Sequence, residues 1–164
     1  MDFKDLLKNN ENLTLNSPIT YINGSVEIKG NQNLIVNGLL VISGNVEIGK
    51  DFCWEERCGF SSITVNYTPG IPAGILVKGN LQFEEWTGDV DVTGLIYTSG
   101  NLEVLSFPFG HNFDIVGGMI GNNLNFSGVL RTINITHSSD ILNEVLTPTE
   151  FSPVITVEHW EEEY

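Results

Sequence analysis

The sequence predicts an all-β protein, a single-stranded parallel β-helix (a solenoid) of about 20–22 residues per coil with a short N-terminal helical cap. Two observations predict the solenoid. Gly-Asn followed by apolar, polar and apolar residues recurs, as at residues 44–48 (GNVEI) and 79–83 (GNLQF). A second glycine recurs between apolar stretches, at Gly38, Gly94 and Gly117. A fixed period of this length is typical of stacked solenoid coils.

The segment from residue 33 to residue 48 shows how one coil would form. It contains three apolar stretches, 34–36, 39–42 and 46–48, separated by Asn-Gly and Ser-Gly. Glycine and asparagine tolerate positive φ and so turn the chain sharply between strands. Because side chains alternate along a strand, the first and last residues of 46–48 point inward and Glu47 points outward.

Asparagine recurs at one position of the repeat. Asn45, Asn80, Asn101 and Asn123 each follow a turn and precede the third strand of a coil. Equivalent residues of stacked coils lie about 4.8 Å apart, so aligned asparagine side chains can bond from coil to coil. We therefore predict that these four residues form a structural ladder.

The chain reads as one domain, residues 1–164. Residues 2–8 can form a short amphipathic helix, and we expect residues 1–10 to cap the first coil. The coils would occupy residues 13–136, with loop insertions at 49–62 and 66–73. We expect an irregular C-terminal segment and a closing strand in residues 137–164, with 154–157 (VITV) as that strand.

The two insertions leave the same coil and carry aromatic side chains. Trp54, Phe60 and Tyr67 are therefore candidate contact residues for a partner, and the alternative is that they pack down onto the coil. Cys53 and Cys58 are the two cysteines of the chain. They would form a disulfide in an oxidising compartment or remain a reduced pair otherwise. No second Cys or His pair has zinc spacing, so we expect no metal site.

The charge balance limits the partners. Seven basic residues stand against 21 acidic residues, a net charge of −14. Such a surface repels phosphate backbones and anionic lipid, so we expect no nucleic acid partner. No apolar run is long enough to span a bilayer, and no motif suggests a cofactor.

The polar residue in the middle of each third strand should point outward, and these residues should form a row along the solenoid. We expect this row to be solvated. The alternative is that its neighbouring carboxylates bind calcium or act in glycoside hydrolysis. The three histidines fall at different phases of the repeat, and no nucleophile stands beside a base, so we predict no catalytic residues and no enzyme. The row consists of Glu27, Glu47, Gln82, Glu103 and Asn125.

The repeat, Ile or Val ahead of Gly-Asn-Leu-x-Val, resembles the β-helical domain of bacterial PilX-like proteins associated with type IV pili, over roughly residues 13–162. Residues 133–142 look like a late strand of that family, and residues 154–162 look like its closing strand, which ends Trp160-Glu161-Glu162. Such proteins normally begin with an apolar prepilin-like helix, which these residues do not contain. The chain is less closely similar to bactofilins, which are cytoskeletal β-helices that polymerise end to end.

The resemblance implies a non-catalytic structural or interaction domain associated with a type IV pilus or secretion machinery. It would act in assembly or adhesion, with protein partners, and its location would be extracellular or at the cell surface. The first alternative is a cytoplasmic, bactofilin-like scaffold that polymerises end to end. The second alternative is a β-helix that binds or cleaves a glycan.

Overall fold

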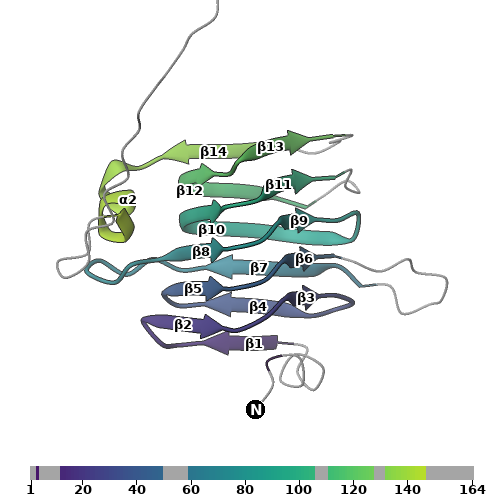
Figure 1. Cartoon of the computed structure of the whole chain (residues 1–164), viewed down its shortest axis with the longest axis horizontal. Helices are drawn as coiled ribbons and strands as arrows, with labels where there is room; N and C mark the ends of the chain where they lie inside the picture. The colour runs from purple at the N-terminus through teal and green to yellow at the C-terminus, as the bar shows by residue number, and fades with distance from the viewer. Residues whose placement is uncertain (1–2, 4–11, 50–58, 106–110, 128–131, 147–164) are drawn as a thin grey trace, which may run out of the picture.

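The computed structural model describes residue 3 and residues 12–49, 59–105, 111–127 and 132–146. The described chain forms a parallel β-solenoid, which confirms the predicted fold class. All pairings between named strands are parallel, and they join equivalent strands of neighbouring coils. The stack rises from β1 at one end to β14 at the other (Figure 1).

The strands fall into three sets, one for each face of the coil. The first strands are β1 (Asn12–Leu15), β4 (Asn33–Val36), β7 (Ser61–Val65) and β14 (Ile133–His137). The second strands are β2 (Ile19–Ile22), β5 (Leu39–Ile42) and β8 (Gly74–Val77). The third strands are β3 (Val26–Ile28), β6 (Val46–Ile48), β9 (Leu81–Phe83), β11 (Asn101–Val104) and β13 (Asn123–Phe126). In the fourth and fifth coils the first two strands merge into β10 (Thr87–Thr98) and β12 (Phe113–Ile120).

This merging differs from the predicted three separate strands per coil. It joins the first and second faces into one nine-stranded sheet, while the third face is a five-stranded sheet. Gly94 and Gly117 lie opposite each other where the long strands bend. Gly117 has φ 137°, and a Cβ there would lie 2.2 Å from the carbonyl oxygen of Gly94. Only glycine therefore allows the chain to bend here while the strand pairing continues.

The core fills the inside of the coil. In β6 the side chains of Val46 and Ile48 are buried, and Glu47 between them is only half-buried. Phe83 and Phe113 are both fully buried, and their rings meet edge to face with centroids 5.0 Å apart. Alternation along each strand thus sends one side chain inward and the next outward, as the repeat predicts.

The predicted asparagine ladder is present and also uses backbone groups. The Oδ1 atom of Asn45 accepts a hydrogen bond from the backbone N–H of Asn80 at 2.9 Å, and Asn80 Oδ1 accepts one from Asn101 at 2.9 Å. The side-chain amide of Asn123 donates to Asn101 Oδ1 at 2.9 Å. A Cβ at Gly100 would lie 2.3 Å from Asn80 Oδ1, so this ladder explains the glycine before the asparagine.

Two further ladders, which the sequence analysis missed, edge the first face. Their side chains are 2.6–2.8 Å apart from coil to coil. The signal for them was polar residues spaced by about one coil. One ladder links Asn12, Asn33 and Ser62, and the other links Asn16, Asn37 and Asn66.

The C-terminal part of the described chain contains a helix where we expected irregular structure. α2 (Ser139–Leu146) follows β14 and has Asp140 in its first turn, where a carboxylate is favourable. Ile141 is buried, which shows the apolar side of the helix packing inward. Pro148 biased the expectation towards a loop, although the run from 139 to 146 is long enough for two helical turns.

Of the predicted N-terminal cap, only Phe3 is described. It has helical geometry and packs half-buried against the core, and the rest of residues 1–10 lies outside the described residues. The predicted insertion 66–73 matches the gap between β7 and β8. The predicted insertion 49–62 overlaps β7, which begins at Ser61, and its residues 50–58 lie outside the described residues.

Candidate functional site

The loop aromatics predicted as contact residues are found in different places. Trp54, Cys53 and Cys58 lie outside the described residues. The Phe60 ring packs against Trp86, with centroids 5.6 Å apart, and against His111, with centroids 4.3 Å apart. For Phe60, the structure therefore favours the alternative of packing onto the chain.

Tyr67 follows β7, whereas Phe60 precedes it, so the two residues lie beyond opposite ends of that strand. Its hydroxyl donates a 2.8 Å hydrogen bond to Glu144 Oε1 of α2. Both carboxylate oxygens of Glu144 also accept from the backbone N–H of Gly70, at 3.1 and 3.2 Å. This hydrogen bond to Glu144, together with burial and the charge of Asp140, raises the pKa of Tyr67. We call this contact between α2 and the 66–73 loop the clasp.

The outer surface of the third face is polar. Its outward position is occupied by the row predicted from the sequence, which we call the polar row: Glu27, Glu47, Gln82, Glu103 and Asn125. Within it, Gln82 Nε2 donates a 2.8 Å hydrogen bond to Glu103 Oε2. On the first face, Asn134 likewise donates to Asp114 at 2.6 Å. These two faces suit contact with water.

The second face differs, because its outward side chains are apolar or aromatic. One position of five successive coils pairs in register, as Tyr21 with Val41, Val41 with Leu76, Leu76 with Tyr97, and Tyr97 with Ile120. We call these five residues the apolar column. Tyr21 is 64% exposed, Tyr97 36% and Ile120 41%. Five stacked coils make the column about 19 Å long.

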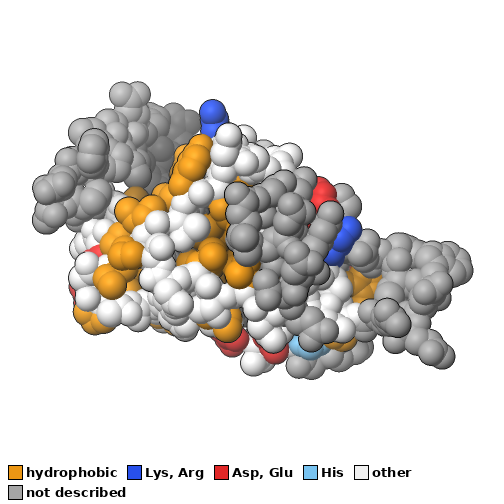
Figure 2. Space-filling view, turned by 90° about the horizontal axis from the view of Figure 1, so that it is seen from below, with side chains coloured by type: hydrophobic (Ala, Val, Ile, Leu, Met, Phe, Trp, Pro, Cys, Tyr) orange, Lys and Arg blue, Asp and Glu red, His pale blue; other side chains and the backbone are white. Residues whose placement is uncertain are grey.

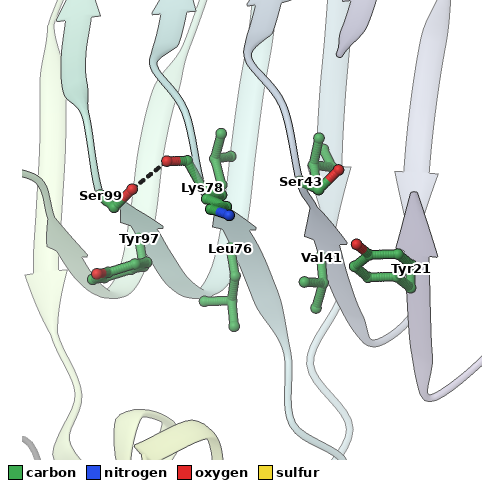
Figure 3. Close-up of a pocket in the computed structure, with 9 residues that line it drawn as sticks. Tyr21, Val41, Ser43, Leu76, Lys78, Tyr97 and Ser99 are labelled. Carbon is green, nitrogen blue, oxygen red and sulfur yellow. Dashed lines mark hydrogen bonds between the residues drawn. The ribbon is translucent and has the colours of Figure 1, made fainter. Parts of the chain in front are cut away.

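A groove lies along this column. Figure 3 shows Tyr21 and Tyr97 on either side of Val41 and Leu76, with these side chains on the same side of the strands. The groove has a volume of about 340 Å³. Its edge is formed by strand ends, where Ser99 donates a hydrogen bond to the carbonyl of Lys78 (Figure 3). An apolar floor with tyrosine side chains and few polar groups is typical of a protein contact surface.

The chain itself covers the neighbouring part of the same face. Leu95 is directed outward, two residues before Tyr97, yet it is only 1% exposed. α2 contacts β10 and β12, and a Cβ at Gly118 would lie 3.0 Å from the Leu142 side chain. The helix therefore packs on one outward row of the second face and leaves the apolar column uncovered.

The sequence analysis missed this column, although a signal for it exists. A strand buried on one side reads as alternating apolar and polar residues, whereas a strand with two apolar faces reads as a continuous run. Residues 39–42 (LLVI) and 75–77 (ILV) are such runs, and 46–48 (VEI) and 81–83 (LQF) alternate. The continuous runs marked the second face as apolar on its outside.

A metal site, a histidine–carboxylate pair and a membrane span are three further features that can be checked in the described residues. Within those residues, no three His, Cys, Asp or Glu side chains lie close enough to hold a metal ion. His111 Nδ1 is 3.4 Å from Asp89 Oδ1, which also accepts a 2.8 Å bond from the backbone of Asn112. In the part of the chain that is described, no helix has the length and apolar character of a membrane span.

The described features define the chain as a β-solenoid with one apolar outer face. Comparison with known protein families, with curated proteins and with solved structures finds no match.

Proposed function

We propose that this protein is a non-catalytic interaction module that binds another protein through the apolar column. The observation that carries the proposal is the exposure of Tyr21, Tyr97 and Ile120 in one continuous row of the second face. Contiguous exposed apolar surface is uncommon on soluble proteins and marks contact sites. Tyrosine is enriched among the residues that dominate binding energy.

The charge of the chain narrows the class of partner. The net charge of −14 favours a partner that carries basic groups around an apolar strip. α2 supplies a precedent on the same face, because it contacts β10 and β12 there, with Leu142 over Gly118. A helix or strand with one apolar side would suit the free groove.

The proposed location and partner machinery are based on the resemblance of the repeat to PilX-like domains. The protein would act in assembly or adhesion with pilus or secretion components, outside the cell or at its surface, without a cofactor. A glycan remains a competitor for the groove, because sugar rings can stack on Tyr21 and Tyr97. The floor of the groove is apolar, formed by Val41 and Leu76, which favours a protein, and the polar side chains Ser43, Lys78 and Ser99 line its edge.

A second candidate function is the end-to-end scaffold, which would be cytoplasmic. One observation favours it: Leu124 and Phe126 of β13 and Ile135 of β14 are exposed, so the end of the described stack presents apolar surface. Exposed strand edges can pair with another chain.

Site-specific photocrosslinking in the native cell tests the proposal. A crosslinking residue at position 41 should capture a distinct protein, and the matched probe at position 47 in the polar row should not. Leu76→Glu should abolish the product from position 41 without unfolding the chain. Equal capture from both positions, or capture of a second copy alone, would overturn the proposal. Binding of the purified chain to an array of neutral glycans, lost in Tyr97→Ser, would assign the groove to sugars instead.

A further inference from the structure

The floor of the groove offers side chains but no free strand edge. Val41 on β5 and Leu76 on β8 lie on this floor, and each of these strands pairs with a neighbour on both sides. The backbone N–H and C=O groups of β5 and β8 are therefore used within the sheet, and a partner strand cannot extend the sheet at this place. An isolated strand lying on the apolar floor would leave its own backbone groups unpaired, whereas an α-helix pairs them internally.

The spacing of the column also suits a helix. From Tyr21 to Tyr97 the column crosses four successive coils, and neighbouring coils are about 4.8 Å apart, so this stretch is about 14 Å long. Successive turns of an α-helix are about 5.4 Å apart, so about three turns can place an apolar side chain near each coil. Along an extended strand the side chains of one side are about 6.6 Å apart, and they fall out of step with the coils.

Helix α2 shows the direction that a helix takes on this face. The backbone N–H of Ser138, just before α2, donates to the carbonyl oxygen of Gly117 in the fifth coil, at 3.0 Å. Glu144 accepts from the backbone N–H of Gly70, in the loop of the third coil. From residue 138 to residue 144 an α-helix rises about 9 Å, and two coils span about 10 Å. α2 therefore runs along the stack, across β12 and β10, which it contacts (Figure 1).

The two sides of the groove differ in character. On one side is the row of Leu95, which the chain itself buries. On the other side Ser43, Lys78 and Ser99 follow the second strands and form a polar edge. A helix in the groove would therefore need an apolar stripe for the floor and polar residues towards this edge, which is the pattern of an amphipathic helix.

The column is accessible at the end of the stack that begins with β1. Tyr21 and Ile19 of β2 are 64% and 58% exposed. Figure 2, seen from this end, shows hydrophobic side chains with few charged side chains among them, beside residues drawn in grey. The described residues therefore leave room for a helix at this end of the column. At the other end, the closing strand expected at residues 154–157 lies outside the described residues.

We propose that the occupant of the groove is a basic amphipathic α-helix of a partner protein, which lies along the stack with its apolar stripe on Val41 and Leu76. This inference rests on the proposed function and specifies the segment that the partner contributes. Basic residues on the helix are favoured because the chain has 21 acidic residues against seven basic residues. The length of the helix on the column is about three turns.

Binding of synthetic peptides to the full chain, measured by fluorescence anisotropy, tests the proposal. The first peptide has about 14 residues, with leucine at every third or fourth position and lysine beside this stripe. The second peptide has the same composition with leucine and lysine alternating, as in a strand. The third peptide is the first with a proline at its centre, which breaks a helix. The first peptide should bind at least about tenfold more tightly than either of the others.

Two variants of the chain place the same added charge on different faces. Leu76→Glu puts a carboxylate in the groove and should weaken binding of the first peptide at least about tenfold, although it makes the chain more acidic. Gln82→Glu puts a carboxylate in the polar row and should leave the affinity within about twofold. Circular dichroism reports whether both variants remain folded. A nitroxide label at one end of the peptide should broaden the amide resonances of β2, and a label at the other end those of β10, because the helix lies along the stack.

Equal binding of the three peptides, with loss of binding in Leu76→Glu, would keep the column as a contact surface and overturn the helix as its occupant. Equal binding to Leu76→Glu and Gln82→Glu would show attraction by charge alone. Broadening of one and the same coil by both labels would contradict the orientation along the stack. Dimers in analytical ultracentrifugation that excess peptide does not dissociate would assign the groove to a second copy. The proposed function is tested separately by capture from position 41, so its failure and the failure of the helix can be told apart.

Discussion

The apolar column and the polar row are built on the same scaffold and differ only in their outward side chains. Each runs across five coils with residues paired in register, one with Tyr21 at its start and the other with Glu27. The side chains beneath both rows form an apolar core. The coils therefore stack whether the outward residues are apolar or polar. The difference therefore shows that the apolar surface is not needed for the solenoid, and this makes it a candidate contact surface.

The largest effect is expected where inward and outward positions of one strand are compared. Phe83 is fully buried, and Gln82 beside it belongs to the polar row. Phe83→Ala should lower the free energy of unfolding by about 3–5 kcal/mol, because it removes apolar contacts and leaves a cavity. Gln82→Ala should lower it by about 1 kcal/mol or less, because it removes only the hydrogen bond to Glu103. Urea denaturation measures both free energies. Similar losses in the two variants would contradict the assignment of Phe83 to the core and Gln82 to the outer surface.

A reciprocal exchange between the two columns should alter surface hydrophobicity more than stability. Leu76→Gln combined with Tyr97→Gln should strongly reduce the fluorescence of a bound hydrophobic dye. Glu47→Leu with Glu103→Leu should create dye binding on the third face. Each double variant should keep its free energy of unfolding within about 1 kcal/mol, the sum of two surface changes. If the first double variant binds dye unchanged, the apolar column is not the accessible surface.

Within the polar row, Glu47 lies in register with Glu27 on one side and with Gln82 on the other. Gln82→Glu should lower the free energy of unfolding by about 0.5–1 kcal/mol at low salt, because it places a carboxylate opposite Glu47 and Glu103 and removes the hydrogen bond that Gln82 donates to Glu103. The repulsive part of this loss should shrink at high salt, where it is screened. Urea denaturation at two salt concentrations measures the loss, and a value that does not change with salt would show that charge does not act in this row.

The smallest effect concerns the clasp, which lies beside the apolar column. The pKa of Tyr67 is raised above its ordinary value of 10.0 by its hydrogen bond to Glu144. Because the fold favours the protonated phenol, this contribution to stability is complete below pH 10 and is lost as the pH rises through the raised pKa. Tyr67→Phe should remove that alkaline dependence. In an ultraviolet titration, Glu144→Ala should return the Tyr67 pKa towards its ordinary value, and an unchanged titration would contradict the assignment.

Much of the fold could be predicted because the repeat is local. Gly-Asn before a third strand and glycine between the first two strands recur at a nearly constant spacing, and each has a steric or hydrogen-bonding reason that operates within neighbouring coils. Helix α2 was missed because a single amphipathic run of eight residues gives a weak signal beside two prolines. The contact role predicted for Phe60 and Tyr67 stays a prediction, and the sequence did not indicate the neighbours that these two side chains have far along the chain, His111 and Glu144.

The sequence by itself determined the stacking, the inward and outward sides of each strand and the asparagine ladder. These follow from period and alternation, which depend on backbone geometry alone. Only the tertiary structure decided which outward residues stay exposed, because that depends on where α2 and the 66–73 loop come to rest. Leu95 and Tyr97 both point outward from β10, yet packing of distant residues buries the first and leaves the second in the groove.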